Sequence, residues 1–387
     1  MKQKIIYIAN VRLPTEKAHG LQIMKMCEAF GKFEVRSSKF EEKDSRIEVE
    51  LVVPRRRNPI TEDPFDYYGV ERNFTVTRIP TLDIVSFGRV GFWVEQTLFL
   101  LFARLYLFGK KCFVYTREEA TGFFFRNNFL ELHTLPAHEG AVHRLLWRRA
   151  RHIFVLTTLM KEQLMEWGIS EQKLTVLPDA VDFNAFDISI SKEDARKKLF
   201  LPLDKKIVLY TGSFFRYPWK GVDTLLEVAQ NYQKEEVLFV LVGGSERELK
   251  QAKEKYPGKN IVLLGHESPR AIPLFLKASD VLVLPNKSGY EMSEKHTSPL
   301  KLFEYMASGR PIVSSDIPSL REVLTEKEAI FFKPNDPKDL ARVLAELLNN
   351  SVLADSLSES AREKAKSYTW DKRAERALGV LVPNVSP

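Results

Sequence analysis

The segment 298–311, SPLKLFEYMASGRP, combines charged side chains with the marks of a helix start and stop. Ser298 is a typical N-cap residue, Pro299 suits the first helical position, and a glycine and a proline end the helix. Lys301 then falls in the first turn, where a cation opposes the helix dipole unless an anion docks there. Glu304 lies on the same face, where its carboxylate can accept hydrogen bonds from two neighbouring hydroxyls. A surface pair between Lys301 and Glu304 explains the same spacing, so both interpretations stay open.

A second cationic segment follows the strand expected over 207–211. It contains Gly212, Arg216, Lys220 and Gly221, and a helix begins after it. Ligands of open α/β sheets bind at the carboxyl ends of the strands. Arg216 and Lys220 are therefore placed to meet phosphate oxygens, and the two glycines permit close approach of the backbone. Solvent-facing loop charges are the ordinary alternative.

The elements that must position these residues alternate between short apolar runs and amphipathic segments. Strands are expected over 4–9, 49–53, 75–79, 112–116, 129–133, 152–157, 207–211, 237–242, 261–264, 281–284, 312–315 and 329–332. Helices are expected between them, for example over 20–30, 222–233, 270–278 and 299–308. Continuously apolar strands joined by crossover helices predict doubly wound α/β sheets with both faces covered.

The alternation falters once, between residues 177 and 191, where turn-forming residues replace the periodic pattern. We therefore expect an N-terminal domain over 1–184 and a C-terminal domain over 185–367. The last helix, 368–381, is expected to pack back on the first domain.

Composition narrows the classes of function. The 387 residues carry 58 Lys and Arg against 51 Asp and Glu, a net charge of +7 that permits an anionic ligand without selecting one. The basic residues are scattered, which argues against nucleic acid as a partner. No segment has the pattern of a signal peptide, and none reaches the ~20 apolar residues that a membrane span needs. Cys27 and Cys112 are the only cysteines in the sequence, which does not suggest a disulfide-rich secreted protein. A cytoplasmic protein is therefore expected. Gly-x-Gly-x-x-Gly and P-loop motifs are absent from the sequence, which argues against dinucleotide and P-loop folds.

Three segments together resemble the family-four retaining glycosyltransferases, the glycosyl transferases of group 1. They are the Gly…Lys-Gly loop 212–221, the Val-Gly-Gly turn 242–244 and the helix 298–311. The segments 177–182 and 368–375 resemble the interdomain segment and the closing helix of that family. The resemblance implies the GT-B fold, in which two doubly wound Rossmann-like domains face each other across a cleft.

The resemblance also implies a nucleotide-diphosphate sugar of UDP or GDP type as donor, with no cofactor and no metal ion. Lys220 and Arg216 would contact the diphosphate, Glu304 the ribose, and His133 of the N-terminal domain would lie near the sugar as the fourth catalytic residue. The donor-binding positions that it implies are Gly20, in a turn before a helix, and Gly212, Ser213, Gly243, Gly265, His266, His296, Ser298, Pro299, Leu300 and Lys301.

Two positions depart from the family pattern. His296 stands where the family often has a glutamate that contacts the sugar, and Ser213 stands where it usually has an arginine. Arg216 is the candidate replacement for that arginine.

The function expected is transfer of a sugar, with retention, to a glycan or lipid-linked acceptor in cell-surface or exopolysaccharide synthesis. A non-catalytic nucleotide-sugar-binding partner protein and a GT-B nucleotide-sugar epimerase are the alternatives. The aromatic segment 92–108, followed by Lys110 and Lys111, suits an interfacial helix in peripheral contact with the inner face of a membrane. A buried crossover helix is favoured instead, because apolar residues lie nearly all round it.

Overall fold

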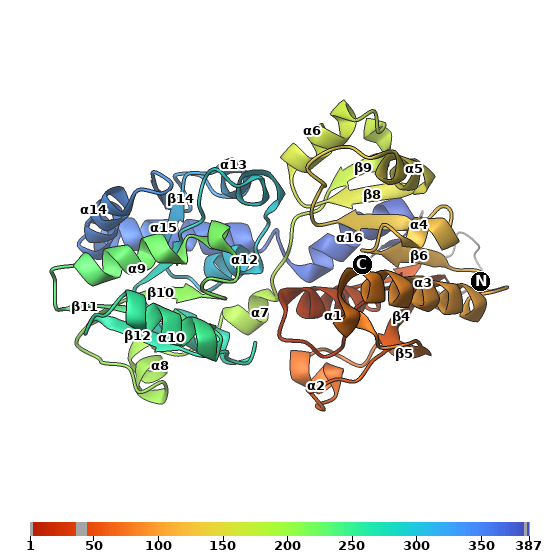
Figure 1. Ribbon diagram of the computed structural model, residues 1–387. Helices are drawn as coiled ribbons and strands as arrows, with labels where there is room; N and C mark the ends of the chain where they lie inside the picture. Colours follow the sequence, from red (N-terminus) through yellow and green to blue (C-terminus); the bar gives the residue numbers. More distant parts are fainter. Residues whose placement is uncertain (1–2, 36–44, 383–384, 387) are drawn as a thin grey trace. The chain divides into compact units, whose positions relative to one another are not determined.

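The computed structural model describes residues 3–35, 45–382 and 385–386. The chain forms two compact units, which Figure 1 shows in the colours of the sequence. Unit 1 comprises Met1–Pro178 and Trp370–Pro387, and unit 2 comprises Asp179–Thr369. The division falls after Pro178, a few residues before the boundary expected at residue 184.

Unit 1 is built on a parallel sheet that has the strand order β5-β4-β1-β6-β7-β8-β9 in the described residues. Its strands are β1 (Lys4–Ile8), β4 (Glu48–Arg55), β5 (Thr75–Pro80), β6 (Phe113–Thr116), β7 (Phe129–Leu132), β8 (His152–Val155) and β9 (Leu174–Val176). All but β9 lie where the sequence predicts strands. A small antiparallel sheet joins β2 (Glu34–Val35), β3 (Ser45–Arg46) and β16 (Val385–Ser386).

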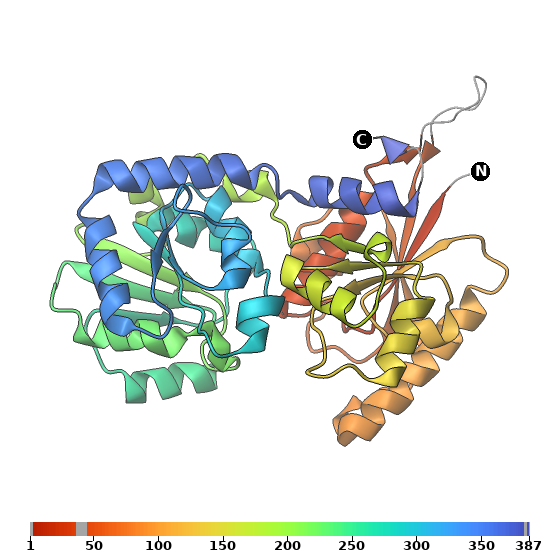
Figure 2. The ribbon, with the colours of Figure 1, turned by 90° about the horizontal axis from the view of Figure 1, so that it is seen from above.

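The helices of unit 1 cover the parallel sheet. They are α1 (Ala18–Phe30), α2 (Pro64–Tyr68), α3 (Gly88–Tyr106), α4 (Thr121–Phe124), α5 (Ala141–Arg149), α6 (Thr158–Glu166) and α16 (Trp370–Leu381), with short 3₁₀ turns at Val85–Phe87 and Glu171–Lys173. Helix α16 packs against α1, so the end of the chain returns to the unit in which it began (Figure 2).

Helix α3 corrects the expectation of a crossover helix that is buried all round. Phe99, Leu100 and Ala103 are fully buried in one core cluster with residues of β1 and β4. On the other side of the helix, Trp93 is 58% and Leu105 is 62% exposed. The sequence is apolar on both sides, but only one side has a sheet to pack against.

Unit 2 has a second parallel sheet, with the order β12-β11-β10-β13-β14-β15 over the described residues. Its strands are β10 (Lys206–Thr211), β11 (Val237–Val242), β12 (Ile261–Leu264), β13 (Val281–Leu284), β14 (Ile312–Ser315) and β15 (Ile330–Phe332). Its helices are α7 (Phe183–Phe186), α8 (Lys192–Lys198), α9 (Val222–Asn231), α10 (Glu246–Lys255), α11 (Ile272–Ala278), α12 (Leu300–Ala307), α13 (Pro318–Arg321), α14 (Pro337–Leu348) and α15 (Ser351–Ala365), with a 3₁₀ turn at Pro218–Lys220 and a π-helical turn at Met292–His296.

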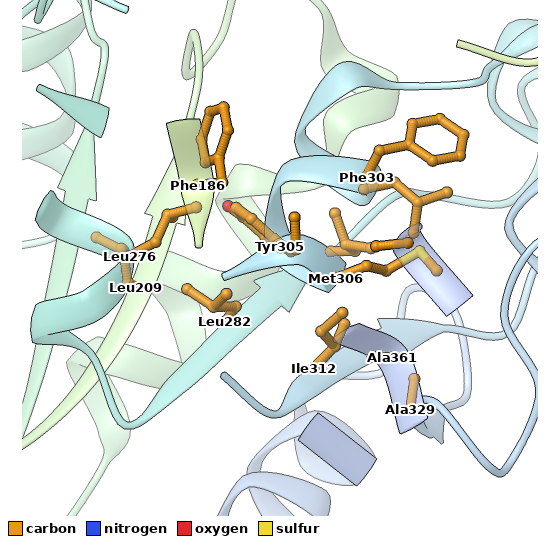
Figure 3. Packing of buried hydrophobic residues seen from close by; sticks show 14 of the residues in the cluster. Phe186, Leu209, Leu276, Leu282, Phe303, Tyr305, Met306, Ile312, Ala329 and Ala361 are labelled. Carbon is orange, nitrogen blue, oxygen red and sulfur yellow. The ribbon is translucent and has the colours of Figure 1, made fainter. Parts of the chain in front are cut away.

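Successive residues of β10 serve two different cores in unit 2. Leu209 belongs to a core cluster that also includes Phe303 and Met306 of α12, and Figure 3 shows it beside Leu276 of α11. Val208 and Tyr210 point to the opposite face, into a cluster with α9 and α14. This alternation places apolar helices on both faces of the sheet, which leaves its carboxyl edge for polar chemistry.

Candidate functional site

The candidate residues of unit 2 gather where four neighbouring strands end. Gly265 follows β12, Gly243 follows β11, Gly212 follows β10, and Asn286 comes shortly after β13. The carboxyl ends of parallel strands share one edge of a sheet, and ligands of doubly wound sheets bind at that edge.

Glycine is required at this edge because the backbone turns there are tight. Gly212 has a φ of 122° and Gly243 a φ of 113°, in a region that other residues rarely adopt. A Cβ atom on Gly243 would lie 3.0 Å from the backbone of Gly212. The Gly243 amide donates to the carbonyl oxygen of Gly265 at 3.0 Å, and His266 next to it is exposed. The turns after β10, β11 and β12 therefore stay in contact.

Two lysines bring their ammonium groups to the turn after β10. Lys301 Nζ donates to the carbonyl oxygen of Thr211 at 3.2 Å and lies 3.8 Å from the ring centroid of Tyr210. Lys220 Nζ donates to Ser213 Oγ at 2.9 Å. Ser213, which replaces the usual arginine of the family, is thus a hydrogen-bond acceptor for Lys220.

The surroundings of the two ammonium groups disfavour their charged forms. Burial, followed by the positive charge of Lys220, lowers the pKa of Lys301 far below its usual value. Burial also lowers the pKa of Lys220 to about 8; the carboxylate of Glu248 opposes this shift and Arg216 adds to it. Within residues 3–35, 45–382 and 385–386, neither group has a salt bridge to a carboxylate. Neighbouring cations without a salt bridge, beside half-buried turns of backbone, are suited to bind an anion.

The start of α12 adds unpaired backbone donors, in a way that corrects the expected cap. Pro299 occupies the N-cap position and gives no side-chain cap to the helix. Ser298 lies one residue earlier, and its hydroxyl accepts a hydrogen bond from the Asp179 amide at 3.0 Å instead. The first amides of the helix, at Leu300 and Lys301, therefore have no side-chain partner among the described residues and remain donors for a ligand.

Glu304 lies on the same helix as Lys301 without pairing with it. Burial raises the pKa of its carboxyl to about 7, while Lys301 opposes the shift and Asp179 adds to it. No hydrogen bond to this carboxyl is made by any residue in the part of the chain that the structure describes. The carboxyl is therefore free to accept hydrogen bonds from hydroxyl groups of a ligand.

Glu248 is a positioning residue that the sequence analysis missed. Its Oε1 accepts the amides of Phe215 and Arg216 at 2.7 and 2.8 Å, and its Oε2 accepts from Ser245. Burial raises its pKa, but these hydrogen bonds outweigh burial and lower it overall. Ser245 and Glu248 form a capping box, a spacing visible in the sequence that could have revealed the residue. The side chain of Arg216 is exposed, with its guanidinium 5.5 Å from the ring centroid of Tyr217.

Buried polar atoms without partners lie in the segment between β13 and α12. His296 is 3% exposed and its Nε2 has no hydrogen-bond partner among the described residues. The same holds for Ser293 Oγ and for both amide atoms of Asn286. Burial lowers the pKa of His296, which keeps its ring neutral. Unsatisfied buried donors and acceptors are costly, so this segment is suited to hydroxyl groups supplied by a ligand.

His133 belongs to unit 1, where it follows β7. Its Nε2 contacts Glu131 Oε1 at 2.5 Å, and Arg373 binds the same carboxylate. Burial raises the pKa of Glu131, but Arg373 and then His133 lower it well below its usual value. Burial and the cation of Arg117 lower the pKa of His133 to about 4, so the ring is neutral near pH 7 and Nε2 donates to Glu131.

Gly20, also in unit 1, corrects the expectation of a glycine-bearing turn. It lies inside the first turn of α1 and is buried. A Cβ atom there would lie 2.1 Å from the Tyr68 hydroxyl oxygen and 2.7 Å from Cγ2 of Thr15. Close packing against Tyr68 is therefore enough to explain why this residue is glycine.

Two kinds of feature are absent from the described residues. No group of three His, Cys, Asp or Glu side chains is arranged to hold a metal ion in residues 3–35, 45–382 and 385–386. None of the helices described in those ranges has the length and apolar character needed to cross a membrane.

Comparison with known proteins agrees with this architecture. Residues 191–364, most of unit 2, match the family model described as glycosyl transferases group 1. A phosphatidyl-myo-inositol mannosyltransferase of Mycobacterium leprae is 28% identical over 178 residues, which are 45% of this chain and 46% of that protein. The chain covers 46% of the length of two of the curated relatives that it matches and 72% of the length of a third.

Two solved structures share the fold at low identity. A sucrose-phosphate synthase from Thermosynechococcus elongatus has 19% identity and a TM-score of 0.75, with 98% of each chain covered. The Anabaena protein HepE in complex with UDP and glucose has 13% identity and a TM-score of 0.73, with 97% of this chain and 99% of that chain covered. The two parallel sheets and these neighbours define a protein of the GT-B fold. The family model that matches residues 191–364 describes the same family that the sequence motifs resemble.

Proposed function

We propose that this protein transfers a sugar, with retention, from a nucleotide-diphosphate sugar to a glycan or lipid-linked acceptor. The observation that carries the proposal is the pair of ammonium groups of Lys220 and Lys301, which lie without carboxylate partners beside the turn at Gly212 in the part of unit 2 that the structure describes. A diphosphate supplies the negative charge that this arrangement lacks. HepE, a solved structure with UDP and glucose, supports the choice of a nucleotide-diphosphate donor of UDP or GDP type.

The proposed chemistry follows from where charge develops. When the glycosidic bond to the diphosphate breaks, negative charge grows on the leaving phosphate. Lys220, Lys301 and the first amides of α12 stabilise that charge more strongly in the transition state than in the ground state. In this proposal the protein supplies the positive charge and no metal ion is needed. Arg216, an exposed residue of the loop 212–221, adds to that charge.

The remaining donor groups are assigned by their chemistry. Glu304 accepts hydrogen bonds from the two hydroxyls of the ribose, because its carboxyl has no other partner in the described residues. The segment of Asn286, Ser293 and His296 supplies unpaired atoms for hydroxyls of the sugar. The backbone near Gly243 and Gly265, with His266, is assigned to the diphosphate and the base.

Unit 1 is assigned to the acceptor, and His133 to the vicinity of the transferred sugar. A lipid-linked acceptor is supported by the relative named a phosphatidyl-myo-inositol mannosyltransferase, whose name denotes a lipid substrate. We place the reaction in the cytoplasm, in the synthesis of a cell-surface or exopolysaccharide. The free thiols of Cys27 and Cys112 suit a reducing compartment.

Thermal unfolding of the full chain with UDP, GDP, ADP and their common sugars tests the donor site. A ligand that binds only the folded state must raise the melting temperature. We expect a rise with one nucleotide class, abolished in Glu304→Ala and in Lys220→Met. Lys338→Met, which removes an exposed lysine of unit 2, should keep the rise. The absence of any shift at millimolar nucleotide would count against a donor site.

Product analysis then separates the activities. Transfer predicts a new glycoside only when donor and acceptor are both present, with the anomeric configuration of the donor retained. An epimerase converts the donor sugar to its isomer without an acceptor. A non-catalytic binding protein gives the thermal shift without any product.

A further inference from the structure

The solvent side of α3 and its flanks exposes a dense group of large apolar side chains. Those exposed by 40% or more are Phe87, Val90, Trp93, Val94, Leu101, Phe102, Leu105 and Phe108, which we call the α3 face. Folded domains rarely expose so many apolar residues together unless the patch has a binding function. The donor site of unit 2 does not involve this helix.

The other side of α3 packs against the core of unit 1. Phe99 and Leu100 are fully buried, and Glu95, also fully buried, accepts from Arg56 Nε at 2.9 Å. The apolar core and this ion pair fix which side of the helix points outward. The exposed side is thus a rigid surface and not a loosely packed part of the core.

The neighbouring helices also expose apolar side chains. Helix α4 packs against both α3 and α5, and Figure 1 shows it between them. Phe123 of α4 is 47% exposed, and Val142 and Leu145 of α5 are 55% and 49% exposed. Three helices that pack in sequence therefore each expose apolar side chains.

The exposed charges on α3 and on the residues that follow it have one sign. The exposed charged residues of α3 are Arg89 and Arg104, and Lys110 and Lys111 follow the helix. Glu95 is the only acidic residue between positions 84 and 117 of the sequence, and it is buried in its pair with Arg56. Lys110 Nζ lies 3.5 Å from the ring centroid of Tyr106, so apolar and cationic groups occur side by side.

We infer that the α3 face docks on an anionic phospholipid bilayer, with its apolar side chains inserted at the interface and its cations beside the lipid phosphates. A helix with aromatic and aliphatic side chains outward and only basic groups among its exposed charged residues has the chemistry that binds such interfaces. A second copy of the chain fits less well, because symmetric pairing would bring Arg89, Arg104 and the two lysines of each copy close together. This inference is independent of the proposed donor and sugar transfer.

Sedimentation of the full chain with sucrose-loaded vesicles tests the docking. The probes are phosphatidylcholine alone and phosphatidylcholine with about a third phosphatidylglycerol, compared at low and high salt. We expect binding to the anionic vesicles that weakens as salt rises. Phe87→Ser/Trp93→Ser/Leu105→Ser should lower the partition coefficient by on the order of tenfold or more, because three exposed anchors are lost.

A matched control removes as many exposed apolar groups from unit 2. Phe200, Leu203 and Val352 are 96%, 52% and 80% exposed, and their triple serine variant should bind vesicles as the wild type does. All six changes are at exposed positions, and unchanged melting temperatures would show that both variants fold. Lys110→Glu/Lys111→Glu should reduce binding to the anionic vesicles by about tenfold or more and leave the weak binding to phosphatidylcholine unchanged.

Three results would overturn the inference. These are the absence of binding to anionic vesicles, equal binding by the α3 triple variant and the wild type, and a dimer in light scattering that the α3 variant converts to a monomer. The last would assign the face to a second copy. Lys220→Met should bind vesicles normally while losing nucleotide, so failure of the donor proposal and failure of membrane docking are separate outcomes.

Discussion

The guanidinium of Arg373 lies against both carboxylate oxygens of Glu131, at nitrogen–oxygen distances of 3.0 and 3.2 Å. Both side chains are only 3% exposed, and the pair joins α16 to β7. Arg373 also donates to the carbonyl oxygens of Leu177 and Pro178, the last residues of unit 1 before the chain enters unit 2. One side chain thus fixes the returning helix, the sheet and the end of the unit.

Replacing Arg373 by Met should destabilise unit 1 by about 3–5 kcal/mol, because Glu131 would keep a buried charge without its cation. The free energy of unfolding in urea, followed by tryptophan fluorescence, measures the loss. Lys372→Met on the same helix breaks an exposed contact with Glu375 and should cost no more than about 1 kcal/mol. Equal effects of the two variants would contradict the role given to Arg373.

Lys301→Met should have opposite effects on the free and the ligand-bound protein. Affinity for the nucleoside diphosphate should fall about 10- to 100-fold, because a charge-assisted contact to phosphate is lost. The free protein should gain about 1 kcal/mol of stability, because a cation that burial and Lys220 both disfavour is removed. Calorimetric titration and urea unfolding of the same preparation test both effects, with Lys338→Met as control. A loss of stability in the free variant would contradict the electrostatic account.

Glu304 should make stability depend on pH between about 4.5 and 7. Burial raises its pKa in the folded protein to about 7 from the usual 4.5, so the folded state holds the proton through this interval. Stability is therefore fully favoured below pH 4.5 and decreases as the pH rises towards 7, by on the order of 1–3 kcal/mol. In Glu304→Gln this part of the decrease should disappear. Urea unfolding of both proteins at pH 5 and pH 7 gives the comparison, and identical pH profiles would contradict it.

Binding of nucleoside diphosphate should draw protons from solution at pH 8. Lys220 has a pKa lowered to about 8, so it is about half protonated there, and a bound diphosphate restores its charge. Titration calorimetry in two buffers of different ionisation enthalpy should give an uptake of about half a proton or more per site. Lys220→Met should reduce the uptake. Heats that are the same in both buffers would rule out this coupling.

His296 should distinguish the sugar from the nucleotide. If its unpaired Nε2 binds a sugar hydroxyl, His296→Ala should leave the affinity for free nucleoside diphosphate within about twofold of the wild type. The additional affinity for the nucleotide sugar should fall by about tenfold, the value of one hydrogen bond. Titration of the variant with both ligands provides the test, with the free nucleotide as internal control. A parallel loss for both ligands would mean that His296 only supports the local structure.

The strands of both sheets could be predicted because their side chains are apolar on both faces, as in Val208 and Leu209 of β10. Strand β9 (Leu174–Val176) escaped detection because it has only three residues, one of them a threonine. Ser298 was expected to cap α12, but its hydroxyl binds the distant amide of Asp179, a contact that local sequence cannot reveal.

The side of α3 that faces water was likewise beyond prediction, since its residues are apolar on both sides and only the sheet determines which ones are covered. The glycines and lysines of unit 2 gather at one edge of the sheet, as their positions after strands predict, and the binding role given to them stays a prediction. Glu248 positions the loop around Arg216 by accepting hydrogen bonds from backbone amides. Such a role leaves no sequence motif, and only the capping box with Ser245 marks the residue.

The return of α16 to unit 1 has a consequence for how the chain folds as it is synthesised. Unit 2 is an insertion within unit 1, because Trp370–Pro387 belong with Met1–Pro178. Unit 2 is complete once Thr369 has left the ribosome, whereas unit 1 still lacks Arg373 and the helix that packs on α1. Domains usually fold in order from the N-terminus, but here unit 1 can be completed only after unit 2. Glu131 is paired with Arg373 only once α16 has been synthesised.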